Sequence, residues 1–323
     1  MSRFPLCVVP LFLAATMWAD DAGKQLDAAD SLAAGCSEFA CKLYGQIRTR
    51  EGNLCLSPFS ISTAGAMLTA GANGDTAKQL NDAFVFPAAR EDLLKDWRRM
   101  RKRLGKSVSV GEVTLRLANA AWFEKSEPPI ASYTGALDNA FRAHVFPTSF
   151  RTAPDAARSE INAWVARATR QRGMQLFGLG IITGQTAVVL VNAAYFQGSW
   201  RDEFDRYDTK RRTFHLAANR RIRVPTMRRQ TTTRYAQHRM LKVVPLSYKS
   251  CSLEMILLVP EKVDGLADVE AALTGEKLAE WLQPGKAWRK SVEVKLYLPK
   301  FRIKSDFRLK VPLQALGVKD AFS

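Results

Sequence analysis

The 323-residue sequence has few of the residue types from which enzymes build active sites. It contains three histidines and five cysteines, and it has no His-Glu-x-x-His, Gly-x-Ser-x-Gly or Cys-x-x-Cys motif. His144, His215 and His238 lie far apart in the sequence, and we interpret each as structural. The glycines at 178–184 have the spacing GxGxxxG and precede a predicted strand, so they do not match a dinucleotide loop. The sequence therefore predicts no enzyme, no metal site and no cofactor.

Long hydrophobic runs are also missing, and no segment reaches the roughly 20 apolar residues that a membrane-spanning helix needs. The longest apolar stretch, at 4–18, follows Arg3 and ends before Asp20, which is typical of a secretory signal peptide. We predict that residues 1–19 are a signal peptide, that the protein is secreted and extracellular, and that it does not span a membrane.

Removal of this segment leaves an even number of cysteines, namely Cys36, Cys41, Cys55 and Cys251. In an oxidising compartment these permit one or two disulfides, among them a bridge between Cys36 and Cys41. Isolated buried thiols are the alternative, because free cysteine is among the most buried residue types.

Acidic residues are scarce relative to basic ones, with 31 Asp and Glu against 48 Lys and Arg, a net charge of +17. Polyanions are therefore the expected long-range partners. The densest basic segment contains Lys95, Arg98, Arg99, Arg101, Lys102, Arg103 and Lys106. On a helix, steps of three and four residues would bring most of these cations, from Lys95 to Lys106, onto one stripe. A polyanion would relieve their repulsion, and an ordinary solvated face is the alternative.

A second basic stretch consists of Arg220, Arg221, Arg223, Arg228, Arg229 and Arg234. It falls on predicted strands and turns, and we interpret it as a solvated face. Neither basic stretch carries the interleaved exposed aromatic residues that are typical of single-stranded nucleic-acid binding. We therefore expect no nucleic-acid partner.

Hydrophobic periodicity predicts helices first and strands later. The predicted helices are 30–44, 58–71, 74–84, 90–104, 155–170 and 269–281. The predicted strands are 112–123, 187–196, 222–227, 231–236, 242–245, 253–259 and 292–298. Ser57 and Pro58 are a strong helix start, and the apolar run AVVLVNAAYF at 187–196 predicts a central strand covered on both faces. Because the sequence has no repeats and no Gly/Ser-rich linker, we predict one intertwined α+β unit.

Several motifs share their order with one known family. SPFSIS at 57–62 and AVVLVNAAYFQGSW at 187–200 are the most specific of them. The others are LANA at 117–120, INAWV at 161–165, LPKF at 298–301 and LGVKDAFS at 316–323. With these motifs, the sequence resembles the serpins from about residue 31 to its last residue.

The resemblance implies the α+β serpin fold, in which helices pack around three β-sheets with sheet A central. It also implies a monomeric inhibitor of a serine or cysteine protease. In such proteins the target cleaves an exposed reactive loop, which then inserts as a strand into sheet A and deforms the attached protease.

Particular residues acquire expected roles through this resemblance. Ser57, Ser60 and Asn192 would form a polar "shutter" beneath the opening strands. Gly198, Trp200 and Lys300 would lie at the "breach", where insertion begins. The helix at 90–104 corresponds in position to one that binds heparin in some serpins, so heparin or another sulfated glycosaminoglycan is the expected ligand of Lys95, Arg98, Arg99, Lys102, Arg103 and Lys106.

The family places a sheet A strand, a hinge, the reactive loop and closing strands after LGVKDAFS, whereas this sequence stops at Ser323. We therefore expect a serpin domain at 20–323 that is truncated before its reactive-loop segment and contains no reactive-site bond. The full-length form would be a secreted serine-type endopeptidase inhibitor, and the 323-residue chain would be inactive as an inhibitor. A non-inhibitory, serpin-fold binding or carrier protein is the alternative.

Overall fold

The computed structural model describes residues 28–107, 112–170, 175–217, 220–283, 285 and 287–322. The predicted signal peptide at 1–19 lies outside the described residues. The α-helices are α1 (Ala28–Ile47), α2 (Pro58–Gly71), α3 (Gly74–Phe84), α4 (Arg90–Ser107), α5 (Ala131–Ala136), α6 (Pro154–Ala168), α7 (Leu266–Ala272), α8 (Gly275–Leu282) and α9 (Lys310–Ala315). The strands are β1 (Thr114–Glu124), β2 (Ala143–Thr148), β3 (Val188–Gln197), β4 (Lys210–Ala217), β5 (Arg220–Gln237), β6 (Leu241–Ser247), β7 (Glu254–Pro260) and β8 (Trp288–Pro299). Short helical turns are η1 (Leu137–Phe141), η2 (Arg206–Asp208) and η3 (Asp320–Phe322).

Local sequence signals set several helix ends as predicted. Ser57 caps α2, because its Oγ accepts a hydrogen bond from the backbone N–H of Ser60, and Pro58 occupies the first helical position. The predicted helix at 269–281 is two helices. The first, α7, ends at Ala272, and Thr274 caps α8 because its Oγ1 accepts a hydrogen bond from the N–H of Lys277.

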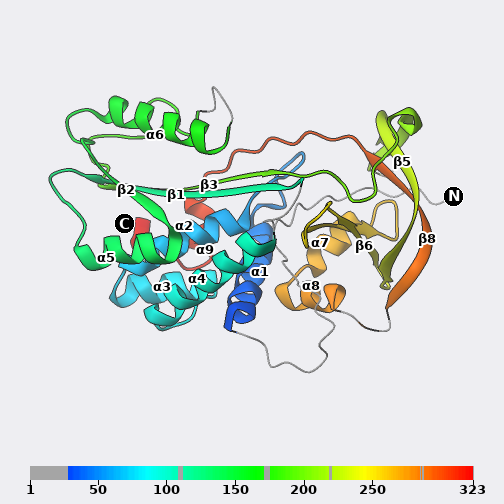
Figure 1. The fold of residues 1–323 in the computed structure, drawn as a ribbon, viewed down its shortest axis with the longest axis horizontal. Coiled ribbons are helices and arrows are strands. Elements are labelled where there is room, and N and C mark those ends of the chain that lie inside the picture. Colours follow the sequence, from blue (N-terminus) through cyan, green and yellow to red (C-terminus); the bar gives the residue numbers. More distant parts are fainter. Residues whose placement is uncertain are drawn as a thin grey trace.

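A three-stranded sheet with the order β2-β1-β3 lies between two layers of helices. Figure 1 shows α6 on one face of this sheet and α2, α3 and α4 on the other. The α6 side is filled by a cluster that includes Trp122, Ile161 and Val191, and the opposite side belongs to the main core, which includes Met67 and Trp97. The helical layers therefore determine which side chains of each strand are buried.

The strand at 187–196 forms as β3 but is not central. Its faces are covered as predicted, since Val189 and Val191 pack under α6 and Leu190 packs on the main core. However, β3 pairs only with β1 in the described part of the chain, and β1 is the middle strand. An apolar run indicates that both faces of a strand are covered. It does not indicate whether another strand pairs with each edge, because that strand comes from a distant part of the sequence.

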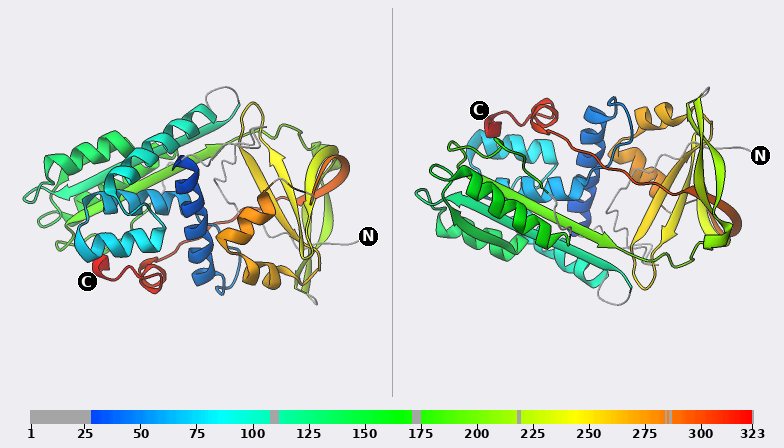
Figure 2. Two further views of the ribbon diagram at one scale, coloured as in Figure 1. Left: turned by 90° about the horizontal axis from the view of Figure 1, so that it is seen from below. Right: turned by 90° about the horizontal axis from the view of Figure 1, so that it is seen from above.

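A second sheet contains β4, β5, β6 and β7 in that order, with β8 also paired to β5. The predicted strands at 222–227 and 231–236 are one long strand, because β8 pairs with β5 from Thr226 through Thr233 without a break. Helices α7 and α8 pack on this sheet through a core that includes Val243, Leu258 and Trp281. After β8, residues 300–309 run without strand pairing back to α9, as Figure 2 shows.

Candidate functional site

The start of α2 carries two of the hydroxyls that the sequence predicts for the shutter. The Ser57 hydroxyl donates to the Ser60 Oγ at 2.9 Å, in addition to capping the helix. Both side chains are half-buried, and α2 packs directly against β3. Ser57 therefore caps the helix, and it also lies at the start of a helix that packs against β3.

The third predicted shutter residue, Asn192, belongs to a ladder of amides across the sheet. Its Nδ2 donates to the Asn119 Oδ1 at 2.7 Å, and the Asn119 Nδ2 donates to the Phe141 carbonyl at 2.8 Å. The Oδ1 of Asn192 is buried and has no hydrogen-bond donor among the described residues. The ladder thus ends at β3 on an acceptor that is not satisfied.

The residues predicted for the shutter lie in two neighbouring groups. No hydrogen bond joins Ser57 or Ser60 to Asn192 in the part of the chain that the structure describes. Sequence reasoning missed Asn119, which lies directly opposite Asn192 in the strand register. Its motif, LANA at 117–120, was visible, but only the pairing of β1 with β3 shows which residue faces the amide.

Two of the predicted breach residues meet around Tyr248, where β3 leads toward the second sheet. The Trp200 ring stacks on the Tyr248 ring with centroids 4.6 Å apart, and the Phe196 ring meets Tyr248 edge-on at 4.7 Å. A Cβ at Gly198 would lie 2.9 Å from the Tyr248 ring, so only glycine fits there without displacing the aromatic cluster. Burial raises the pKa of Tyr248 to about 12.

Lys300, the other predicted breach residue, makes no polar contact with this cluster among the described residues. Its backbone N–H donates to the Pro225 carbonyl at 2.9 Å, and its exposed side chain makes no hydrogen bond or ion pair among the described residues. The structure therefore brings Gly198 and Trp200 together through Tyr248, a residue that the sequence did not single out.

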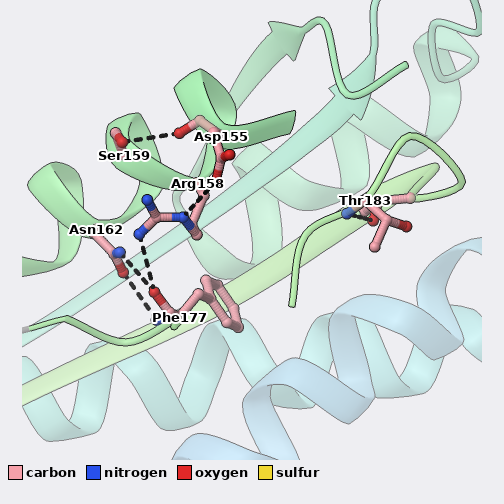
Figure 3. Close-up of polar contacts among 7 residues, drawn as sticks. Asp155, Arg158, Ser159, Asn162, Phe177 and Thr183 are labelled. Atoms are coloured by element: carbon pink, nitrogen blue, oxygen red, sulfur yellow. Dashed lines mark hydrogen bonds and ion pairs between the residues drawn. The ribbon is translucent and has the colours of Figure 1, made fainter. Parts of the chain in front are cut away.

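The helix over the sheet is tied to the chain that follows it. The buried Asn162 of α6 accepts from the N–H groups of Leu176 and Phe177 and donates to the Phe177 carbonyl, all at 2.9 Å. Figure 3 shows Asn162 facing Phe177. Arg158, which also pairs with Asp155 at 3.1 Å, points toward the same carbonyl. One asparagine thus holds the backbone at Leu176 and Phe177 against α6.

The predicted basic stripe is present on α4. Leu93, Trp97 and Leu104 are buried, so the opposite face of the helix turns to solvent. Exposed cations on that face are Lys95, Arg98, Arg99, Lys102 and Lys106, whereas Arg103 is half-buried. Arg101 turns toward the Ala140 carbonyl, and burial and the nearby Arg142 lower its pKa.

The four described cysteines are free thiols in the structure. Burial raises the pKa of Cys36 to about 12, and burial together with Glu38 raises that of Cys41 to about 12. The predicted bridge between Cys36 and Cys41 is therefore absent from the structure; Cys41 is buried and Cys36 is half-buried. Among the residues that the structure describes, no helix combines the length and apolar character that a membrane crossing requires.

Comparison with known proteins identifies the class to which this fold belongs. The family model for serpins (serine protease inhibitors) matches residues 34–323, and the chain belongs to this family, which is not a family of enzymes. It is 32% identical over 302 residues to the leukocyte elastase inhibitor of Bos taurus, covering 91% of this chain and 78% of that protein. It is 30% identical over 312 residues to Serpin B3 of Homo sapiens, covering 91% and 79%.

Solved serpin structures have the same fold, which confirms the predicted α+β serpin fold. Emu (Dromaius novaehollandiae) ovalbumin matches with a TM-score of 0.85 at 26% identity, covering 91% of this chain and 79% of that one. Reaction-loop-cleaved lamprey angiotensinogen matches with a TM-score of 0.81 at 27% identity, covering 92% and 87%. A cleaved ovalbumin mutant in its loop-inserted structure matches with a TM-score of 0.82 at 26% identity, covering 91% and 80%.

Proposed function

We propose that this serpin, in a form that carries a reactive loop, inhibits a serine-type endopeptidase by inserting that loop into the β2-β1-β3 sheet. The main support for this proposal is the outer edge of β3, which has no strand partner in the described part of the chain. An inserted strand would satisfy the open backbone groups of this edge. It could also bring a donor to the buried Oδ1 of Asn192.

Two further observations support this proposal. Residues 300–309 are extended and unpaired, and they are held by a hydrogen bond from the backbone N–H of Cys55 to the Ser305 Oγ at 2.9 Å. The open outer edge of β3 and this extended segment suit a sheet that takes up further strands. In addition, one similar structure is that of a cleaved, loop-inserted ovalbumin mutant.

The test is a search for the covalent complex that such a trap must form. The protein is purified from its native source, its intact mass and C-terminal peptides are determined, and it is incubated with a panel of active serine proteases. We expect a 1:1 band that resists SDS with at least one protease, and no band when the catalytic serine of that protease is blocked. Cleavage of the inhibitor by every protease of the panel without any such band would contradict trapping.

That contrary result would favour the second candidate function, a non-inhibitory binding or carrier protein with the serpin fold. The observation that favours it is the close fit to angiotensinogen and ovalbumin structures, neither of which is named as a protease inhibitor. Thermal unfolding before and after cleavage separates the two candidates. A trap should gain stability when its cleaved loop inserts, whereas a protein whose loop stays outside should not.

We also propose that the protein is secreted after removal of residues 1–19. The support is the sequence pattern alone, an early Arg3 followed by the apolar stretch at 4–18. Expression of the full chain in secretory cells, followed by N-terminal sequencing of protein from the medium, tests this step. A mature protein that begins near Asp20 agrees with it, and a chain that stays in the cells with Met1 intact does not.

Finally, we propose that the exposed stripe on α4 binds a sulfated glycosaminoglycan. Lys95, Arg98 and Lys102 are exposed one or two turns apart, so a linear polyanion could contact all of them. Replacing these three residues by alanine should lower the salt concentration at which the protein leaves heparin. Replacing the exposed Lys125, Arg239 and Lys262 by alanine removes the same charge away from both basic stretches and serves as the control. Equal shifts for both variants would show an effect of net charge, and would contradict a site on α4.

A further inference from the structure

A long stretch of the sequence contains cations and no acids. Between Asp208 and Glu254 there is no Asp or Glu, while this span holds twelve Lys and Arg residues. The structure neutralises several of them with acids from outside the span. Arg228 pairs with Asp208, Arg234 with Glu254, Lys242 with Glu261 and Lys249 with Glu112. Arg229 is buried, and its guanidinium donates to the Asp202 carbonyl.

Seven of the cations have no such partner among the described residues. Arg239 lies exposed in the bend between β5 and β6, and the other six lie on one hairpin. This basic hairpin comprises β4 at 210–217 and the first part of β5 at 220–226. Its cations are Lys210, Arg211, Arg212, Arg220, Arg221 and Arg223. All six are exposed, and none has an ion pair with a carboxylate in the part of the chain that the structure describes. The predicted solvated face is therefore absent from the second half of this stretch, where Arg229 is buried and Arg228 and Arg234 are half-buried and paired with carboxylates. The first half is exposed, and its charge is uncompensated.

Two of these arginines are held in place by the backbone of the opposite strand. Arg211 donates through Nη2 to the Arg223 carbonyl at 2.6 Å, and Arg223 donates through Nη2 to the Arg211 carbonyl at 3.0 Å. In the register, Arg211 faces Pro225, Thr213 faces Arg223, and His215 faces Arg221. Because alternate residues of paired strands share a face, Arg211, Arg221 and Arg223 lie on the same side of the hairpin. The remaining N–H groups of each braced guanidinium can reach a carboxylate at little entropic cost.

The opposite face of the basic hairpin carries apolar side chains together with the cations Lys210 and Arg212. Phe214 faces Ile222, and Arg212 faces Val224 and lies 4.7 Å from the centroid of the Tyr297 ring of β8. The side chains of Ile222 and Tyr297 are 43% and 41% exposed, and Leu216 near the turn is 44% exposed. Exposed apolar side chains that cluster on one face mark a surface that another molecule can cover.

We propose that the basic hairpin is a docking surface for an acidic protein segment that also carries apolar side chains. Its charge is complementary to carboxylates, and the exposed Ile222 and Tyr297 give an apolar partner something to cover. A sulfated polysaccharide would use the cations but would leave these apolar side chains in water. Figure 1 shows β5 at the opposite end of the molecule from α4, so this surface is distinct from the proposed glycosaminoglycan stripe.

The probe is a short fluorescent peptide in which glutamates alternate with leucine and phenylalanine, and anisotropy reports its binding to the full chain. The test variant Arg212→Glu/Arg221→Glu reverses one charge on each face of the hairpin. The control variant Arg98→Glu/Lys102→Glu makes the same change in net charge on α4. We expect the hairpin variant to lose about tenfold or more in affinity and the α4 variant to lose less than about threefold. Equal losses would overturn the proposal.

A second set of peptide affinities tests the contribution of the exposed apolar side chains. Ile222→Ser should weaken the peptide several-fold, whereas a matched peptide with serine in place of leucine and phenylalanine should bind weakly to the unaltered protein. If that polar peptide binds equally well, or if Ile222→Ser binds like the unaltered chain, a general polyanion site replaces the proposed one. Heparin and single-stranded DNA are run as competitors, and a tighter fit of either to the hairpin also overturns the proposal.

Each variant is first compared with the unaltered protein by circular dichroism and urea unfolding. Should the double glutamate variant fail to fold, Arg220→Gln/Arg221→Gln removes two exposed charges without reversing them, and the same loss of peptide affinity is expected. The readout is peptide binding, so it does not depend on whether the protein traps a protease.

Discussion

Asn192 of β3 donates from its Nδ2 to the Oδ1 of Asn119 on β1, at 2.7 Å and in direct register across the two strands. Asn119 in turn donates to the carbonyl of Phe141, the last residue of η1. A single chain of amides therefore connects the edge strand, the central strand and the helical layer. It is a polar link between the open edge of the sheet and the core.

Breaking this link should destabilise the protein. Asn192→Ala leaves the buried Oδ1 of Asn119 without its donor, and we expect a loss of about 1–3 kcal/mol in the free energy of unfolding. Urea unfolding followed by circular dichroism measures this loss. Asn139→Ala, at an exposed position of η1, is the control and should stay within about 0.5 kcal/mol of the unaltered protein.

A double-mutant cycle with Asn119→Ala tests the coupling itself. Residues in direct contact should show an interaction free energy of about 0.5–3 kcal/mol. If the two single substitutions add without coupling, the hydrogen bond between these amides does not stabilise the sheet.

Gly198 should tolerate no side chain, because its ideal Cβ lies 2.9 Å from the Tyr248 ring. We expect Gly198→Ala to lower the free energy of unfolding by about 1–3 kcal/mol and to change the near-ultraviolet circular dichroism of the Trp200 and Tyr248 stack. The matched control is Gly105→Ala in α4, where nothing lies within 4 Å of the added Cβ. There the change should stabilise by about 0.5–1 kcal/mol, since alanine is the better helix former. The same sign of effect at both positions would argue against the steric account.

Local features of the fold could be read from the sequence because their causes are local. The cap at Ser57, the buried face of α4 and the covered faces of β3 each depend on residues within a few positions of one another. The family motifs added the identities of Asn192, Gly198 and Trp200.

What the sequence could not supply are relationships between distant segments. The edge position of β3, the pairing of Asn119 with Asn192 and the stacking of Trp200 on Tyr248 all require knowledge of which strands meet. The same holds for the cations at 220–234. The sequence around these arginines does not show which of them has an acidic partner. In the structure Arg234 pairs with Glu254, whereas Arg221 is exposed and has no such partner among the described residues.

Asn162 should control the order of the segment between α6 and β3. It satisfies two backbone N–H groups and one carbonyl at Leu176 and Phe177. We expect Asn162→Ala to raise amide hydrogen exchange at 175–186 well before it affects β1. Ser159→Ala, which removes one exposed hydrogen bond to the Asp155 carbonyl, is the control on the same helix. Unchanged exchange at 175–186 in Asn162→Ala would show that apolar packing alone holds this segment.

Glu124 at the end of β1 should make stability depend on pH. The backbone N–H of Arg151 donates to Oε2 at 3.0 Å, and this bond, with others from Ser126, holds the pKa of the carboxyl below its ordinary value of 4.5. A lowered pKa in the folded state means that the stabilisation is present above the unfolded pKa and is lost as the pH falls through the folded pKa.

The neutral variant Glu124→Gln lacks this dependence. We therefore expect it to be less stable than the unaltered protein at neutral pH, with a difference that shrinks steadily as the pH falls below 4.5. Urea unfolding at neutral pH and at steps down to about pH 3 measures the difference, and Glu91→Gln at the exposed start of α4 controls for the loss of one carboxylate. A difference that stays constant across this range would mean that the backbone N–H groups bind the neutral side chain as well as the charged one.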